Sequence, residues 1–244
     1  MASRSDSLDL PGLPASPPVP ITRNARRGLR QLALAARSCT ACPLYRDSIQ
    51  TVFGEGPADA VMMLVGEQPG DEEDKQGLPF VGPAGRVLDE VLAEAGIPRE
   101  AIYVTNAVKH FKFILKGKRR LHQKPKTAEV RACQPWLLGE LEHLRPQVLV
   151  ALGSTASASL FGSKVGVLRD RGKPIASDHA PFCFVTYHPS AALRGPSPED
   201  RARVRAALVE DLKLAAAHLA PVHVHEPGHV HVVSKARLPI SQRR

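Results

Sequence analysis

VMMLVGEQPGDEEDKQGLPFVGPAG, residues 61–85, is the stretch that decides the fold. It opens with a short apolar run, residues 61–66, which has the length and composition of a buried β-strand. A loop rich in glycine, proline and carboxylates follows at once, and a helical pattern then covers residues 83–95. A strand that passes through such a loop into a helix is the building unit of α/β proteins.

The rest of the chain repeats this alternation. Short runs of β-branched and aromatic residues predict further strands at residues 102–107, 148–153 and 182–187. Helical patterns cover residues 25–37, 127–144, 154–161 and 198–219. We therefore expect an α/β fold, a three-layer sandwich in which helices flank a central, mostly parallel four-stranded sheet.

Polar side chains stand where three of these strands end. Glu67 follows the first predicted strand, Asn106 lies at the end of the second, and His188 follows the last. Ligands of open parallel sheets bind outside the carboxyl ends of the strands. The sequence therefore predicts that these three side chains share one site.

Length and composition suit a single domain. The 244 residues divide into a Ser/Pro-rich tail at residues 1–24, expected to be disordered, a domain at residues 25–220, and a histidine-rich, basic tail at residues 221–244. No apolar run reaches the roughly 20 residues that span a bilayer, and prolines interrupt the N-terminal segment. We expect a cytoplasmic protein, monomeric, with no membrane partner.

Positive charge is concentrated in one stretch. The net charge is +9, and residues 109–126 hold eight lysines and arginines with no acid. Within this stretch, the loop KRRLHQKP places His122 among four cations. A polyanion such as DNA is the natural partner of this patch, and a solvated charged face is the alternative. Phenylalanine and leucine residues between the cations favour a segment anchored to the fold.

Four cysteines in a chain of this kind do not predict disulfides. Cys39 and Cys42 form a CxxC pair just after the first predicted helix, and Cys133 lies early in a later helix. Cys183 falls inside a predicted strand, where a free thiol packs like a small apolar side chain.

Three segments together carry a resemblance to a known family. GEQPGDEED with GLPFVGPAG after the first strand, TNAVKH at the second strand end and YHPSAALR after the last are similar to the uracil-DNA glycosylase superfamily, over residues 26–218. The branch resembled is family 4, the iron–sulfur type. The KRRLH segment resembles its UdgX subgroup, whose members form a covalent link to uracil-containing DNA. The resemblance implies a DNA-repair enzyme that excises uracil from DNA, single strands included.

The resemblance also implies how uracil is held. Phe80, expected in an exposed turn, supplies a stacking face, and Asn106 pairs with uracil O4 and N3–H. His188 donates to O2 of the departing anion. The structural alternatives are that Phe80 is a core residue, that Asn106 caps a turn and that His188 has only a structural role. Further substrate contacts are expected from Gly66, Gln68, whose backbone and amide would contact the base, Arg119, Arg120, Ser190 and Arg194.

The resemblance makes His122 a nucleophile. If Glu67 holds one ring nitrogen, the other can attack C1′ as uracil leaves, and the adduct persists because alkylated imidazole leaves poorly. The enzyme would then act once. In conventional family 4 enzymes an acid of this motif, Glu67 or Asp71, instead helps water to attack. One alternative is such a conventional multi-turnover glycosylase, in which His122 contacts a phosphate. The other is a catalytically silent DNA-binding protein with an iron–sulfur cluster.

The resemblance implies a [4Fe–4S] cluster as cofactor. Cys39, Cys42 and Cys133 match three family ligands, and His110 stands where the family has the remaining cysteine. A structural zinc ion bound by three cysteines and one histidine is the alternative. We expect a structural role, holding the first helix near the base of the KRRLH segment.

Overall fold

A computed structural model of the protein describes residues 24–219. The predicted tail at residues 1–24, apart from residue 24, and the predicted tail at residues 221–244 therefore lie outside the described residues. Four parallel strands form the central sheet, in the order β2-β1-β5-β6. They are β1 (Met62–Gly66), β2 (Tyr103–Asn106), β5 (Val148–Leu152) and β6 (Phe182–Thr186). The predicted four-stranded parallel sheet is therefore confirmed.

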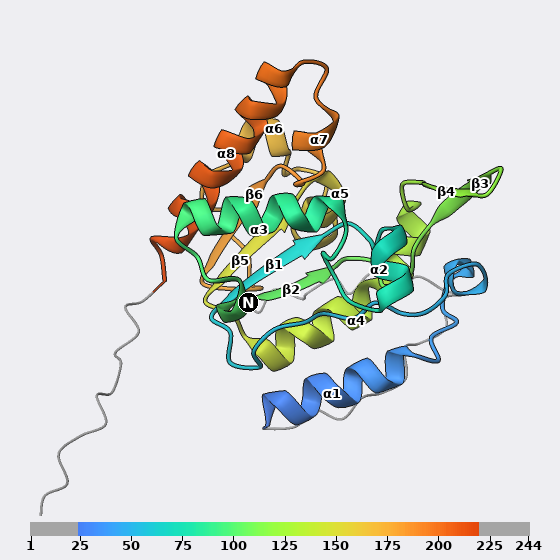
Figure 1. Cartoon of the computed structure of the whole chain (residues 1–244). Coiled ribbons are helices and arrows are strands. Elements are labelled where there is room, and N and C mark those ends of the chain that lie inside the picture. Colours follow the sequence, from blue (N-terminus) through green and yellow to red (C-terminus); the bar gives the residue numbers. More distant parts are fainter. Residues whose placement is uncertain (1–23, 220–244) are drawn as a thin grey trace, which may run out of the picture.

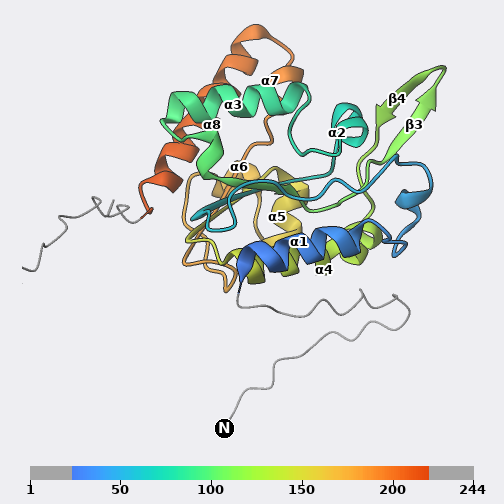
Figure 2. The ribbon, with the colours of Figure 1, turned by 60° about the horizontal axis from the view of Figure 1, so that its bottom comes forward.

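Helices cover both faces of the sheet, which makes three layers (Figures 1 and 2). One face packs against α3 (Pro83–Ala95) and α8 (Pro198–Ala216). The other packs against α1 (Ala25–Ala36), α4 (Thr127–Leu144) and α5 (Ser154–Phe161).

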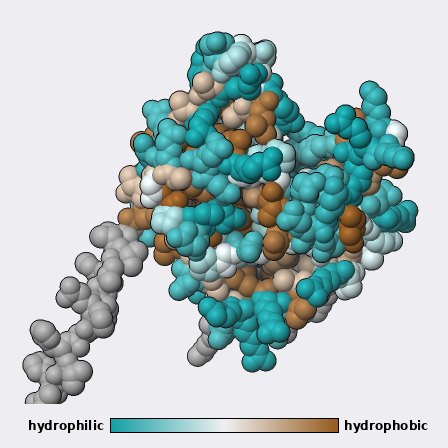
Figure 3. Space-filling view, viewed as in Figure 1, coloured by the Kyte–Doolittle hydropathy of each residue, from teal (hydrophilic) through white to brown (hydrophobic). Residues whose placement is uncertain are grey.

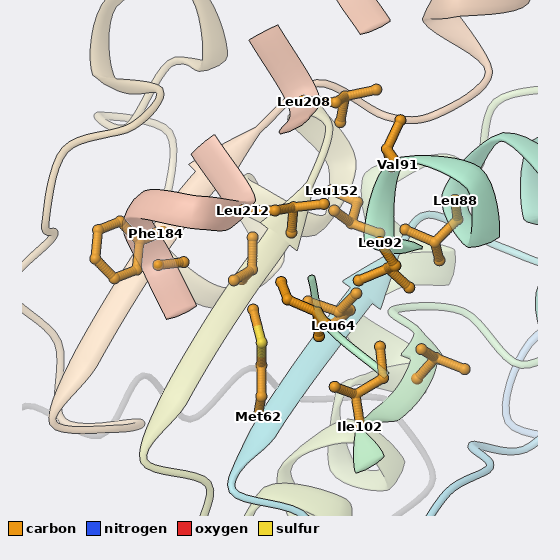
Figure 4. Packing of buried hydrophobic residues seen from close by; sticks show 14 of the residues in the cluster. Met62, Leu64, Leu88, Val91, Leu92, Ile102, Leu152, Phe184, Leu208 and Leu212 are labelled. Atoms are coloured by element: carbon orange, nitrogen blue, oxygen red, sulfur yellow. The ribbon is translucent and has the colours of Figure 1, made fainter. Parts of the chain in front are cut away.

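Side-chain alternation along β1 explains the two cores. Met62 and Leu64 point into the layer formed by α3 and α8, where Figure 4 shows Leu64 among Leu88, Leu92 and other apolar side chains. Met63 and Val65 point into the opposite layer. Successive strand residues face opposite sides of a sheet, so an unbroken apolar run is what a doubly covered strand requires. Cys183, fully buried in β6, belongs to the second layer, as expected of a core thiol.

The boundaries of the predicted elements agree with the structure to within three residues at each end. Several elements were not predicted from the sequence. These are α2 (Asp71–Gln76), β3 (Phe113–Lys116), β4 (Arg119–His122) and the short helices η1 (Pro43–Arg46), η2 (Arg99–Ala101), α6 (Val167–Asp170) and α7 (Ala191–Arg194).

The basic segment forms a β-hairpin, so its description as a loop was wrong. β3 and β4 pair antiparallel and are joined by two residues, Gly117 and Lys118. Gly117 has φ of 61°, which suits the first central position of a tight hairpin turn. The hairpin projects from the body of the protein beside α2 (Figures 1 and 2). No helix among residues 24–219 has the length and apolar character needed to cross a membrane.

Candidate active site

A cavity of about 520 Å³ lies at the carboxyl edge of the sheet, beside α2 and the hairpin. Nine of the predicted site residues line it, namely Glu67, Gln68, Asp71, Phe80, Asn106, His122, His188, Ser190 and Arg194. A larger hollow of about 820 Å³ lies at the opposite edge, among residues that precede the strands, and holds none of these side chains. The predicted catalytic residues therefore meet at the sheet edge where parallel sheets bind ligands.

Asn106 and Phe80 form one wall of the cavity, and Gly66 makes room for both. Gly66 pairs with Asn106 across β1 and β2. A Cβ at Gly66 would collide with Asn106 Oδ1 and come within 2.6 Å of Phe80 Cζ. Within residues 24–219, the Asn106 carboxamide has no hydrogen-bond partner in the protein, and its side chain remains available to a ligand. The missing side chain of Gly66 thus leaves the space that Asn106 and Phe80 occupy.

Phe80 is not in an exposed turn, and that expectation was wrong. Its side chain is buried in the layer beneath α3 while its ring lines the cavity. The backbone has φ of 57°, which a non-glycine residue rarely adopts, so the local turn is held by its surroundings. Its ring centre lies 6.2 Å from that of His188, with the two rings stacked at 27°. The cavity therefore has a flat aromatic face.

His188 is fixed in one tautomer by the short turn that follows β6. Its Nδ1 accepts the backbone N–H of Ser190 at 3.2 Å and lies 2.8 Å from the Ser190 hydroxyl, which Arg194 contacts in turn at 2.5 Å. Burial lowers the pKa of His188 to about 4, with Arg194 and His122 adding to the effect. The ring is therefore neutral at pH 7, and its proton lies on Nε2, a hydrogen-bond donor.

Glu67 and His122 face each other across the cavity. His122 Nε2 lies 3.4 Å from Glu67 Oε1, while the other carboxylate oxygen accepts a hydrogen bond from Thr155. Burial lowers the pKa of His122, against the opposing effect of Glu67 and with a further lowering by Arg194. Thr155 was not predicted from the sequence. Its place just after β5, at a strand end, was the signal that could have found it.

Gln68 anchors the hairpin. Its amide group donates to the carbonyls of Lys112 and Gln123, both at 3.1 Å, and accepts the N–H of Lys112 at 3.2 Å. Lys112 and Gln123 flank β3 and β4, so one side chain ties together the two chains of the hairpin stem. The amide therefore has a structural role, and because Gln68 also lines the cavity its contact with a base stays a prediction.

Arg120 is turned away from a ligand. Its guanidinium binds Asp71 and Asp74, each at 2.5 Å, and lies over the rings of Phe111 and Phe113. Asp74, which the sequence did not single out, is fully buried. Arg120 therefore fastens the hairpin to α2 and holds Asp71 at the cavity. Arg119 is exposed on the hairpin and does not line the cavity.

Comparison with known proteins decides the family. Residues 53–213 match the family model described as the uracil DNA glycosylase superfamily. The chain belongs to this superfamily. Its cavity residues Glu67, Asn106, His122 and His188 all lie inside the matched region.

Three relatives that the chain resembles are type-4 uracil-DNA glycosylases. The chain is 41% identical to the type-4 uracil-DNA glycosylase of Thermotoga maritima over 73% of its own length and 88% of the relative's. It is 36% identical to that of Pyrobaculum aerophilum, over 69% and 86% of the two chains. With that of Sulfurisphaera tokodaii the identity is 35%, over 72% and 78%.

Outside the cavity of this superfamily member, three cysteines gather in a separate cluster. Cys39, Cys42 and Cys133 pack together with apolar side chains beneath α1 and α4. Trp136 Nε1 donates to the Cys39 sulfur at 3.2 Å, and the backbone N–H of Lys109 donates to that of Cys133 at 3.1 Å. Donors aimed at sulfur suit thiolate ligands. The three cysteines therefore lie in one packed cluster, and their role as metal ligands stays a prediction.

His110 is buried, and burial lowers its pKa, with Asp74 opposing. Within the described chain, no hydrogen bond joins its ring to the three thiols. Across residues 24–219, no three His, Cys, Asp or Glu side chains converge on a point where one metal ion would fit. A [4Fe–4S] cluster and the zinc alternative therefore both stay predictions for these residues.

Proposed function

We propose that this protein is a DNA-repair uracil-DNA glycosylase. Its superfamily membership and the names of its type-4 relatives support this assignment. The observation that carries it is the meeting of Phe80, Asn106 and His188 in one cavity at the sheet edge. A base-excising enzyme must extrude a nucleotide and enclose its base in such a pocket.

The cavity matches the needs of uracil excision. The Phe80 ring offers a stacking face, and the free Asn106 carboxamide can both donate to O4 and accept from N3–H, a pattern that cytosine cannot satisfy. His188, neutral and protonated on Nε2, donates to O2, where negative charge develops as the glycosidic bond breaks. Ser190 and Arg194 hold that ring and also line the cavity.

We further propose that His122 captures the sugar, as in the UdgX subgroup. A ring nitrogen forms a bond to C1′, the C1′–N1 bond breaks, and its electron pair leaves with uracil. The other ring nitrogen gives up its proton, which leaves a neutral alkylated imidazole. Glu67, 3.4 Å from the ring, orients it and can accept that proton. The enzyme then remains attached to the abasic sugar.

A conventional multi-turnover glycosylase is the second candidate. It is favoured by the type-4 relatives, whose names say nothing of a covalent product. In that enzyme, Glu67 would direct a water molecule to C1′, and His122 would bind DNA.

We also propose that Cys39, Cys42 and Cys133 hold a [4Fe–4S] cluster, with His110 as the fourth ligand after a local shift. Sulfur ligands that accept N–H donors from Trp136 and Lys109 support this. When bound, the cluster would join α1, α4 and the segment after β2. Analysis of iron and acid-labile sulfide in the purified protein tests the assignment, and a protein with zinc and no iron would contradict it.

One experiment separates these functions. The protein is mixed with a labelled single-stranded oligonucleotide that contains one uracil, heated in SDS and run on a denaturing gel. A band shifted by the mass of the protein, absent with a thymine control, supports covalent capture. Alkali-labile cleavage without the shifted band supports conventional excision. If neither signal appears, the result contradicts glycosylase function and leaves a silent DNA-binding protein.

Replacing Gly66 by alanine should slow uracil excision by roughly 10²-fold, because the new methyl group displaces Asn106 and Phe80 by an ångström or so. The measurement is the single-turnover rate of uracil release at saturating DNA. Gly166→Ala is the matched control, since a Cβ added at Gly166 would meet nothing within 4 Å. A Gly66→Ala enzyme as fast as the wild type would contradict the cavity assignment.

Adduct formation should depend on pH through His122. The attacking ring must be neutral, and burial lowers its pKa below the ordinary value of 6.5. The rate should therefore stay level between about pH 8 and about pH 6.5, and fall only on further acidification, as the ring becomes protonated. His188, with a pKa of about 4, stays neutral across this window. A rate that already falls between pH 8 and about pH 7, measured by quenched-flow gel analysis, would be inconsistent with this assignment.

A further inference from the structure

The two faces of the hairpin differ in what they meet. Residues paired directly across an antiparallel hairpin point to the same side. Phe113 pairs with His122, and Leu115 with Arg120. Near the body this face turns toward the protein, where Phe111 stacks on Phe113, while Leu115 at the tip of the hairpin is 68% exposed. The opposite face, called here the outer face, consists of the pairs Ile114–Leu121 and Lys116–Arg119.

The outer face combines exposed apolar groups with unpaired cations. Ile114 is 53% exposed and Leu121 37% exposed. Lys116 and Arg119 are exposed and form no salt bridge within the described part of the chain. The region of the hairpin is largely hydrophilic in the space-filling view (Figure 3). An apolar pair beside two free cations, with no acid on either strand, is complementary to a polyanion that also carries flat apolar groups.

The same strand that carries this face ends at the cavity, because His122 is the last residue of β4. A nucleotide extruded into the cavity leaves its neighbours without a stacking partner. Isoleucine and leucine side chains can cover a base exposed in this way, while lysine and arginine bind the adjacent phosphates.

We propose that the outer face of the hairpin binds the single DNA strand next to the extruded uridine. Ile114 and Leu121 cover the neighbouring base, and Lys116 and Arg119 neutralise the phosphates beside it. This role rests on the proposed glycosylase function. It adds to that function a surface that guides the DNA strand toward His122.

The test uses the full chain and a fluorescent, uracil-free oligothymidine, whose binding is followed by anisotropy at several salt concentrations. Each cation that binds a single-strand phosphate contributes about 0.7 to the slope of log affinity against log salt. The double variant Lys116→Gln/Arg119→Gln should therefore lower that slope by about 1.4. The double variant Ile114→Ser/Leu121→Ser should weaken binding by roughly tenfold with the slope unchanged.

Matched controls lie far from the hairpin. Arg203→Gln removes an exposed cation of α8, and Leu168→Ser removes a leucine that is 81% exposed in α6. Neither should change affinity or slope. An unchanged slope in the cation variant, or an unchanged affinity in the apolar variant, would overturn the proposal. Because the probe contains no uracil, this result is independent of glycosylase function, which uracil release from a uracil oligonucleotide reports separately.

Discussion

His122→Ser is expected to eliminate the covalent protein–DNA band while uracil release continues. The serine cannot form the bond to C1′ that the imidazole forms, and the smaller side chain leaves space beside Glu67 for a water molecule. Water then completes the reaction, and the abasic strand dissociates. The measurement is the yield of shifted band together with free uracil per enzyme molecule, which should pass from at most one to more than one.

The control for this substitution is His179→Ser. His179 lines the hollow at the opposite edge of the sheet and should not affect capture. An undiminished band from His122→Ser would remove His122 as the nucleophile and would leave the glycosylase assignment intact. Loss of both band and uracil release would give His122 a role in excision itself.

Lys109→Met should lower the free energy of unfolding by about 3–5 kcal/mol, because it leaves a buried carboxylate without its partner. Lys109 and Glu140 are both fully buried, and Lys109 Nζ lies 2.6 Å from Glu140 Oε2. Glu140 also accepts hydrogen bonds from Tyr103, Thr105 and the N–H of Gly54. Glu140 therefore fastens β2 and the segment that follows it to α4.

Urea denaturation of the purified variants measures this effect. The double variant Lys109→Met/Glu140→Leu should recover part of the loss, since it removes both charges together. Lys75→Met, which breaks only the exposed ion pairs with Asp71 and Glu72, should change stability little. A Lys109→Met protein as stable as the wild type would contradict the importance of the buried pair. Because Lys109 Nζ also binds the Asn106 carbonyl at 2.8 Å, we expect weaker base recognition as well.

Much of the fold could be predicted because its signals are local. Apolar runs bounded by turn residues give the strands, and helical spacing gives α3, α4 and α5 with the observed ends. Parallel strands bring their carboxyl ends to one edge, so the order of residues along the chain is enough to place Glu67, Asn106 and His188 together.

The roles of Gln68, Arg120 and Phe80 could not be read in this way. Gln68 meets its partners 44 and 55 positions away, and Arg120 meets Asp71 49 positions away. Whether an amide or a guanidinium contacts a ligand or its own protein depends on which distant groups reach it. Phe80 is buried because α3 folds over a turn whose glycines and prolines alone suggest exposure.

By itself, the sequence determined the layers, the strand order along the chain and the kinds of side chain that gather at the sheet edge. Only the tertiary structure decided that the basic segment is a hairpin, that Thr155 holds Glu67 from 88 positions away, and that three thiols share one apolar cluster. The physical reason is that periodicity and turn chemistry act between near neighbours. Hydrogen bonds and ion pairs between distant segments form only once the sheet has brought those segments together.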